Sequence, residues 1–190
     1  LWAGSFVEAL LDDSKLVYQA LGHTNANPLG SAAGFGSPIF VDRLQTTAAL
    51  GFERPIINAL YCQVSRCKNS EIVVAALSQV MSTLARMAND LVWYTSAWFK
   101  FFELGDDMVT GSSIMPQKKN YDVLELVRAK AGVVYGSLFT LQSINQKMMS
   151  GYNRDLQLTK AEIMKSFSTV EDSLAIMELV WEKLSVNSDN

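Results

Sequence analysis

The spacing of apolar residues in the middle of the chain most restricts what it can fold into. Between residues 73 and 101, large apolar side chains recur in steps of alternately four and three. An α-helix turns once in about 3.6 residues, so this spacing places all of them on one face of a helix. The stripe consists of Val73, Leu77, Val80, Leu84, Met87, Leu91, Tyr94, Trp98 and Phe101. It predicts a helix of many turns within residues 72–102, buried on more than one side.

Two later segments repeat this spacing and predict two more long helices, within residues 122–148 and 163–184. The stripe of the first is Leu124, Val127, Ala131, Val134, Leu138 and Leu141. The stripe of the second is Ile163, Phe167, Val170, Leu174, Met177, Trp181 and Leu184. A weaker pattern predicts a helix over residues 2–21, and a short one over residues 40–50 ends at Gly51.

The sequence therefore predicts an all-α fold, a bundle of long and mostly antiparallel helices. The chain has four prolines, and no stretch of useful length alternates as a strand does. Three such apolar helices carry more apolar surface than one small bundle buries. We therefore expect partner subunits to cover the rest, so that the chain is part of an oligomeric central helical bundle.

Composition excludes several classes of function. The chain has 190 residues, enough for one domain, and its net charge of −3 argues against a general nucleic-acid surface. Cys62, Cys67 and the single histidine, His23, do not form a zinc-binding pattern, so the thiols are expected to be reduced and packed in the core of a cytoplasmic protein. Charged residues interrupt the most apolar stretch, and we expect no membrane segment.

Three loops interrupt the predicted helices, at residues 22–38, 105–116 and 150–151, and long loops in compact domains are often functional. The second leads into the most informative motif, Gly111-Ser112-Ser113-Ile114-Met115-Pro116-Gln117-Lys118-Lys119-Asn120. Hydroxyl groups that include a candidate base are followed here by lysines close to a helix start. Because the N-terminal end of a helix carries partial positive charge, an anionic substrate is the expected partner.

This motif resembles the signature loop of the fumarase/aspartase superfamily, GSSxMPxKxN, at every fixed position. Within the superfamily the chain is most similar to the argininosuccinate lyase branch. That likeness rests on Gln117-Lys118-Lys119-Asn120, on the stretch from Tyr152 to Lys160, and on the glycine-rich loop from Leu29 to Gly34 with Val41-Asp42-Arg43 after it. The resemblance implies β-elimination of argininosuccinate to arginine and fumarate without a metal or cofactor. It also implies a homotetramer whose active sites each collect residues from three chains.

The resemblance assigns roles to six residues. Ser112 is the expected catalytic base, and Lys118 and Asn120 are expected to hold substrate carboxylates. Tyr152, Gln157 and Lys160 match substrate-binding residues of the branch, and the spacing of the last two predicts that they share one helix face. Lys119 is interpreted as a solvated neighbour outside the site.

The chain also departs from the family pattern. The family's Thr-His motif has no match, because His23-Thr24 has the reverse order and falls in the predicted glycine-rich loop. We expect that motif before Leu1 and the usual C-terminal region after Asn190. Residues 1–190 would then be the central helical domain of a lyase, inactive in isolation. Ser65-Arg66-Cys67-Lys68 replaces an Arg-Asp motif, which leaves the role of Arg66 open.

Two alternatives remain open at this point. One is another fumarate-releasing lyase of the superfamily, of the adenylosuccinate lyase or aspartase type. The other is a helical assembly module without activity, because a fold does not fix a function.

Overall fold

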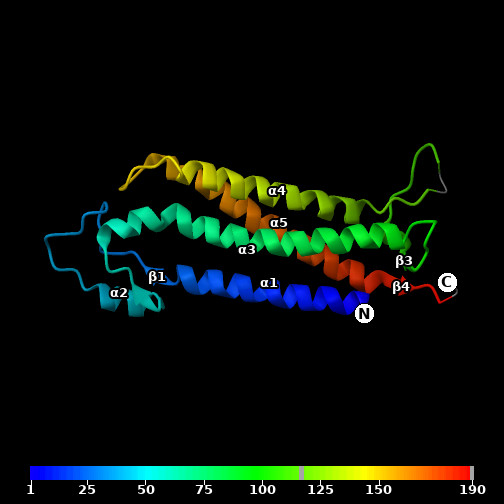
Figure 1. The fold of residues 1–190 in the computed structure, drawn as a ribbon, viewed down its shortest axis with the longest axis horizontal. Coiled ribbons are helices and arrows are strands. Elements are labelled where there is room, and N and C mark those ends of the chain that lie inside the picture. Colours follow the sequence, from blue (N-terminus) through cyan, green and yellow to red (C-terminus); the bar gives the residue numbers. More distant parts are fainter. Residues whose placement is uncertain (116–117, 189–190) are drawn as a thin grey trace.

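A computed structural model describes residues 1–115 and 118–188 of the chain. Within these residues, four long helices form an elongated bundle (Figure 1): α1 (Trp2–Thr24), α3 (Ala59–Tyr94), α4 (Asp122–Asn145) and α5 (Thr159–Lys183). Each runs antiparallel to the one before it (Figure 1), so the predicted all-α fold of long, mostly antiparallel helices is confirmed. The structure also describes a short helix, α2 (Arg43–Ala49), and the 3₁₀ helices η1 (Asp106–Met108) and η2 (Arg154–Gln157).

In the described residues, four very short strands pair loops at the ends of the bundle. At one end, β1 (Ala26–Asn27) pairs in parallel with β2 (Arg54–Pro55). At the other end, β3 (Phe102–Leu104) pairs antiparallel with β4 (Leu184–Val186). Each has two or three residues, which is too short for sequence alternation to reveal.

Helix α3 is the core of the bundle and packs against α1, α4 and α5. It begins where the Asn58 side chain accepts a hydrogen bond from the Tyr61 backbone N–H, at 3.0 Å. It ends at Tyr94, where the hydroxyl of Thr95 donates to the Leu91 carbonyl. By length and apolar composition α3 could also cross a membrane, but 50% of its most apolar window is buried inside this bundle.

The prediction that the α3 stripe continues to Phe101 is wrong. The side chain of Trp98 is 90% exposed in the loop beyond the helix, and Phe101 lies just before β3. The rings of Phe99 and Phe101 instead fold back onto Tyr94, with ring centroids 6.4 and 5.7 Å away. Phe101 continues the helical spacing only in the sequence; in the structure its ring packs around the end of the helix rather than along it.

The stripe predicted for α4 is confirmed, and its members from Leu124 to Leu141 are buried or partly buried. The stripe predicted for α5 is only half right. Phe167, Leu174 and Trp181 are substantially exposed, while the buried face carries Ser166, Val170, Ser173, Met177 and Val180. The two serines fit this face because each hydroxyl donates to the carbonyl four residues earlier, at 2.7 Å for Ser166 and 2.6 Å for Ser173.

Two predicted boundaries near the N-terminus also shift. Helix α1 continues to Thr24, so His23 lies in its last turn and not in the glycine-rich loop as predicted. Helix α2 begins at Arg43 rather than at residue 40, because the Asp42 carboxylate accepts the backbone N–H groups of Leu44 and Gln45. Gly51 follows the helix with a φ of +73°, a conformation that favours glycine.

Large apolar side chains remain exposed along every long helix. They include Leu11 and Tyr18 of α1, Leu126 and Phe139 of α4, and Met164 of α5. This exposure agrees with the expectation that further subunits cover these faces.

Candidate functional site

The signature motif forms a loop that projects from one end of the bundle, between η1 and the start of α4 (Figure 1). Two backbone hydrogen bonds between Thr110 and Asn120, at 3.0 and 2.9 Å, close the base of this loop. The Thr110 hydroxyl also donates to the carboxylate of Asp122, the first residue of α4. The loop therefore has a fixed stem directly before the helix. Pro116 and Gln117 of the motif lie outside the described residues.

Ser112 stands at the start of the loop and is half-buried. Its Oγ accepts hydrogen bonds from the backbone N–H groups of Ile114 and Met115, at 3.3 and 3.2 Å. Two N–H groups aimed at one oxygen stabilise negative charge on that oxygen. This arrangement suits a serine whose hydroxyl must lose its proton.

The two adjacent lysines have different surroundings. Lys119 forms an ion pair with Asp106 at 2.5 Å, and this hydrogen bond raises the pKa of Lys119. Lys118 has no ion-pair partner in the described parts of the chain. Both lysines and Asn120 border a cavity of about 720 Å³. Trp98 and Tyr121 also line this cavity. Lys118 is therefore the lysine that is available to an anion.

The other predicted binding residues lie at the opposite end of the bundle. Tyr152 follows the end of α4, and its ring is 5.5 Å from the guanidinium carbon of Arg66 in α3. Gln157 ends η2 and Lys160 lies in the first turn of α5, so the prediction that they share one helix face is wrong. Both are exposed, and they lie on either side of the turn at Leu158.

The glycine-rich loop lies at this same end and is held by Arg43. Its guanidinium donates to the carbonyls of Leu29 at 2.9 Å and Ile57 at 3.1 Å, and also to that of Ile56. Gly30 has a φ of +87°, and a Cβ there would lie 2.8 Å from Cγ of Arg43. The loop, Gln63 and Arg66 line a cavity of about 390 Å³.

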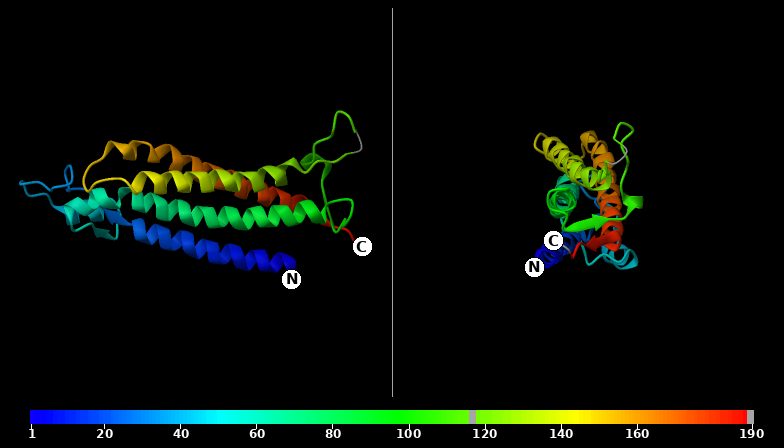
Figure 2. Two further views of the ribbon diagram at one scale, coloured as in Figure 1. Left: turned by 45° about the horizontal axis from the view of Figure 1, so that its top comes forward. Right: turned by 90° about the vertical axis from the view of Figure 1, so that its right-hand side faces the viewer.

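The two groups of predicted residues are therefore far apart within one chain. Ser112, Lys118 and Asn120 precede the N-terminal end of α4, whereas Tyr152 follows its C-terminal end (Figure 2). Helix α4 has 24 residues, and at 1.5 Å per residue it is about 36 Å long. A small substrate cannot touch both groups of the same chain.

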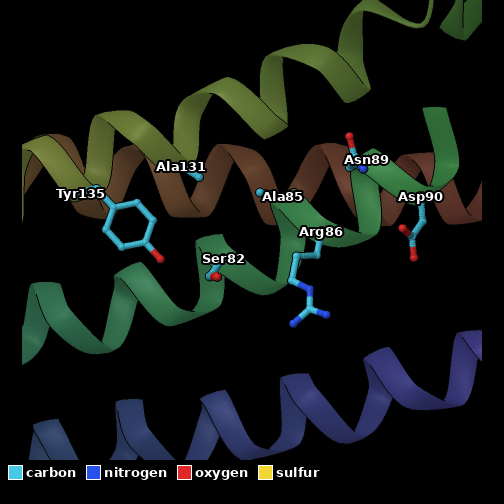
Figure 3. Close-up of a pocket in the computed structure, with 7 residues that line it drawn as sticks. All are labelled: Ser82, Ala85, Arg86, Asn89, Asp90, Ala131 and Tyr135. Carbon is cyan, nitrogen blue, oxygen red and sulfur yellow. The ribbon is translucent and has the colours of Figure 1, made fainter. Parts of the chain in front are cut away.

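Neither of two further cavities joins these groups. One, of about 320 Å³, lies along the middle of the bundle, lined by Arg86, Asn89 and Tyr135 among others. Figure 3 shows Arg86 pointing away from α4 there, towards α1. The other, of about 480 Å³, lies between α1 and α3 and includes His23. His23 lies in the last turn of α1, at the opposite end of the bundle from the Ser112 loop (Figure 1).

The cysteines have the packing role predicted for them, because both are free and buried. Burial, with Glu71 beside the thiol, raises the pKa of Cys67 to about 11, and its sulfur lies 3.4 Å from the Leu141 carbonyl.

Over residues 1–115 and 118–188, no three His, Cys, Asp or Glu side chains gather as a metal site would require.

Sequence reasoning did not identify Asp106 as the partner of Lys119, or Gln63 as the partner of Arg66. Gln63 accepts a hydrogen bond from Nη1 of Arg66 at 3.4 Å, and their spacing of three residues on one helix was the available signal. No local pattern links Asp106 to Lys119.

Comparison with known proteins agrees with this architecture. A family model described as lyase matches residues 1–136. Argininosuccinate lyase of Phocaeicola vulgatus is 39% identical over 98% of this chain and 42% of its own length. That of Thermus thermophilus is 41% identical over 93% of this chain and 38% of its own length. The chain thus spans less than half the length of these curated relatives.

Solved structures share the fold. A class II fumarase from Schistosoma mansoni has a TM-score of 0.84 at 18% identity, covering 97% of this chain and 43% of its own. An EDDS lyase has a TM-score of 0.80 at 24% identity, covering 96% and 36%. The solved structures show the same fold, and the family model, which matches most of the chain, establishes that the chain belongs to the lyase family.

Proposed function

We propose that this chain is the central helical domain of a cytoplasmic argininosuccinate lyase, which eliminates fumarate from argininosuccinate and releases arginine. The observation that carries the proposal is the identity of 37–41% to argininosuccinate lyases over nearly the whole chain. The alternative of an adenylosuccinate lyase or aspartase has less support, because the stretch from Tyr152 to Lys160 resembles the argininosuccinate branch.

In the proposed reaction, Ser112 removes the proton from the carbon beside a substrate carboxylate. The electron pair left on that carbon is delocalised onto the carboxylate, next to Lys118 and Asn120. The C–N bond then breaks, the double bond of fumarate forms, and the departing nitrogen takes up a proton. The N–H groups of Ile114 and Met115 support this role, because they stabilise the serine oxygen as it loses its proton.

The second group of residues is proposed to bind the arginine side of the substrate. A phenol hydroxyl, an amide and an ammonium group, from Tyr152, Gln157 and Lys160, together fit the amino and carboxylate groups of an amino acid. Since these residues lie at the opposite end of α4 from Ser112, each active site would combine the two ends of different chains. A homotetramer, as the family resemblance implies, provides such neighbours.

The test is turnover by the full-length protein that contains this chain. Purified protein should release fumarate from argininosuccinate, and not from adenylosuccinate or aspartate. Ser112→Ala should abolish that release while the oligomer stays intact, because a methyl group cannot accept a proton. Equal turnover of adenylosuccinate would contradict the substrate assignment. A full-length protein that assembles but releases no fumarate from any of the three would favour an inactive assembly module.

A further inference from the structure

The contact between Arg66 and Tyr152 joins two segments that are far apart in the sequence. Arg66 lies in the second turn of the long helix α3, and Tyr152 lies in the connection between α4 and η2. The guanidinium carbon is 5.5 Å from the centre of the phenol ring, within the range of a cation–π contact. Such a contact attracts a planar guanidinium to the face of the ring and limits how the ring can turn.

The rest of the segment fixes the backbone around Tyr152 but leaves its side chain open. The Asn153 side chain donates to the carbonyls of Met149 at 2.8 Å and Gly151 at 3.2 Å. The Tyr152 side chain itself belongs to a residue that is 54% exposed. The guanidinium of Arg66 lies over the face of this ring.

A hydrogen bond to the Gln63 side chain also holds Arg66 in place. Its Nη1 donates to Oε1 of Gln63 at 3.4 Å. Gln63 in turn lies against the glycine-rich loop, where a Cβ on Gly34 would be 3.0 Å from Cγ of Gln63. A continuous series of contacts therefore runs from this loop through Gln63 and Arg66 to the Tyr152 ring.

We propose that Arg66 is a positioning residue for Tyr152: its guanidinium, held by Gln63, fixes the ring so that the phenol hydroxyl faces the substrate. The inference rests on the proposed function, in which Tyr152 binds the amino-acid side of the substrate. Arg66, whose role the sequence left open, then affects substrate binding only through Tyr152. The competing role is direct contact with a substrate carboxylate, since Arg66 also borders the cavity of about 390 Å³.

A double-mutant cycle in the full-length enzyme separates these two roles. Arg66→Met should raise KM for argininosuccinate about tenfold, with a smaller change in kcat. Tyr152→Phe keeps the ring but removes the hydroxyl, so there is nothing left to position. Adding Arg66→Met to Tyr152→Phe should therefore raise KM no further. Arg66→Lys should restore much of the loss, because an ammonium group can also lie over the ring.

The matched control is Arg54→Met, which removes an exposed arginine from β2 at the same end of the bundle. It should leave KM and kcat unchanged. If Arg66→Met raises KM equally in the presence and absence of the Tyr152 hydroxyl, Arg66 contacts the substrate directly and the proposal is overturned. If Arg66→Met instead lowers the melting temperature and the oligomer content, with no separation of KM from kcat, the role is structural and the proposal is again overturned.

Fluorine NMR of a 3-fluorotyrosine placed at position 152 tests the contact without any substrate, so its result does not depend on the proposed function. The ring signal should shift and sharpen in Arg66→Met, because the ring turns more freely without the guanidinium over its face, and Arg54→Met should not change it. An inactive wild type would contradict the proposed function while leaving this comparison intact. An unchanged ring signal in Arg66→Met would contradict the positioning role even in a fully active enzyme.

Discussion

Ser137 of α4 donates a hydrogen bond to Oε2 of Glu162 in α5, with 2.7 Å between the two oxygens. Ser137 is fully buried, and Glu162 also pairs with Lys165 at 2.5 Å. Ser137→Ala should lower the free energy of unfolding by about 1–2 kcal/mol, because the carboxylate loses a partner inside the bundle. Thermal or denaturant unfolding measures this. Ser168→Ala, an exposed serine on α5, is the control and should cost nothing, since alanine favours a helix.

The hydrogen bond between Ser137 and Glu162 also predicts that the stability depends on pH. Glu162 accepts hydrogen bonds from Lys165 and Ser137, and these bonds, above all the one from Lys165, lower its pKa below the usual 4.5. A lowered pKa means that the folded state favours the charged form. The stabilisation is therefore present above pH 4.5 and is lost as the pH falls below that value. The stability difference between wild type and Ser137→Ala should be larger at neutral pH than in acid. A difference that grows on acidification would contradict this assignment.

The glycine-rich loop gives a second prediction of stability. Gly30→Ala should destabilise the loop, because its φ of +87° disfavours any side chain and the new Cβ would lie 2.8 Å from Arg43. We expect a loss of about 1–3 kcal/mol and faster hydrogen exchange in residues 28–36. Gly4→Ala is the matched control, because nothing lies within 4 Å of its Cβ in the regular helix α1. That change should be neutral or stabilising; an equal loss at both positions would contradict the argument.

The two adjacent lysines should differ in function. Lys118→Met should raise the substrate concentration that the full-length enzyme needs by about tenfold or more, because it removes a charge-assisted hydrogen bond to a carboxylate. Lys119→Met should have a much smaller effect, because Lys119 is already paired with Asp106. Steady-state kinetics of the two variants measures the difference. A larger effect at Lys119 would mean that Lys119, and not Lys118, holds the substrate carboxylate.

The sequence predicted the long helices well because their apolar spacing directly reflects how an α-helix is buried. It failed where an apolar residue packs around a helix end, as Phe101 does, or where serines fill a buried face, as Ser166 and Ser173 do. Serine satisfies its hydroxyl on its own helix backbone, so it can enter the core without an apolar signal.

For the candidate site, the sequence provided the residues but not how they are divided in space. The separation of Ser112 from Tyr152 follows from the helix between them, whose length the apolar stripe already indicated. The contact of Arg66 with Tyr152 has no sequence signal, because the two residues approach only once α3 and α4 have packed. Such long-range contacts depend on tertiary structure.

The most direct test of the account is complementation between two impaired variants of the full-length protein, Ser112→Ala and Lys160→Met. At low substrate concentration each should be nearly inactive alone. If each active site combines the Ser112 end of one chain with the Tyr152 end of another, mixed oligomers contain sites in which both ends are intact. Random mixing of the two variants should make about a quarter of the sites complete, and turnover should rise accordingly. Mixed oligomers that form but show no more turnover than the separate variants would contradict the division of the active site between chains.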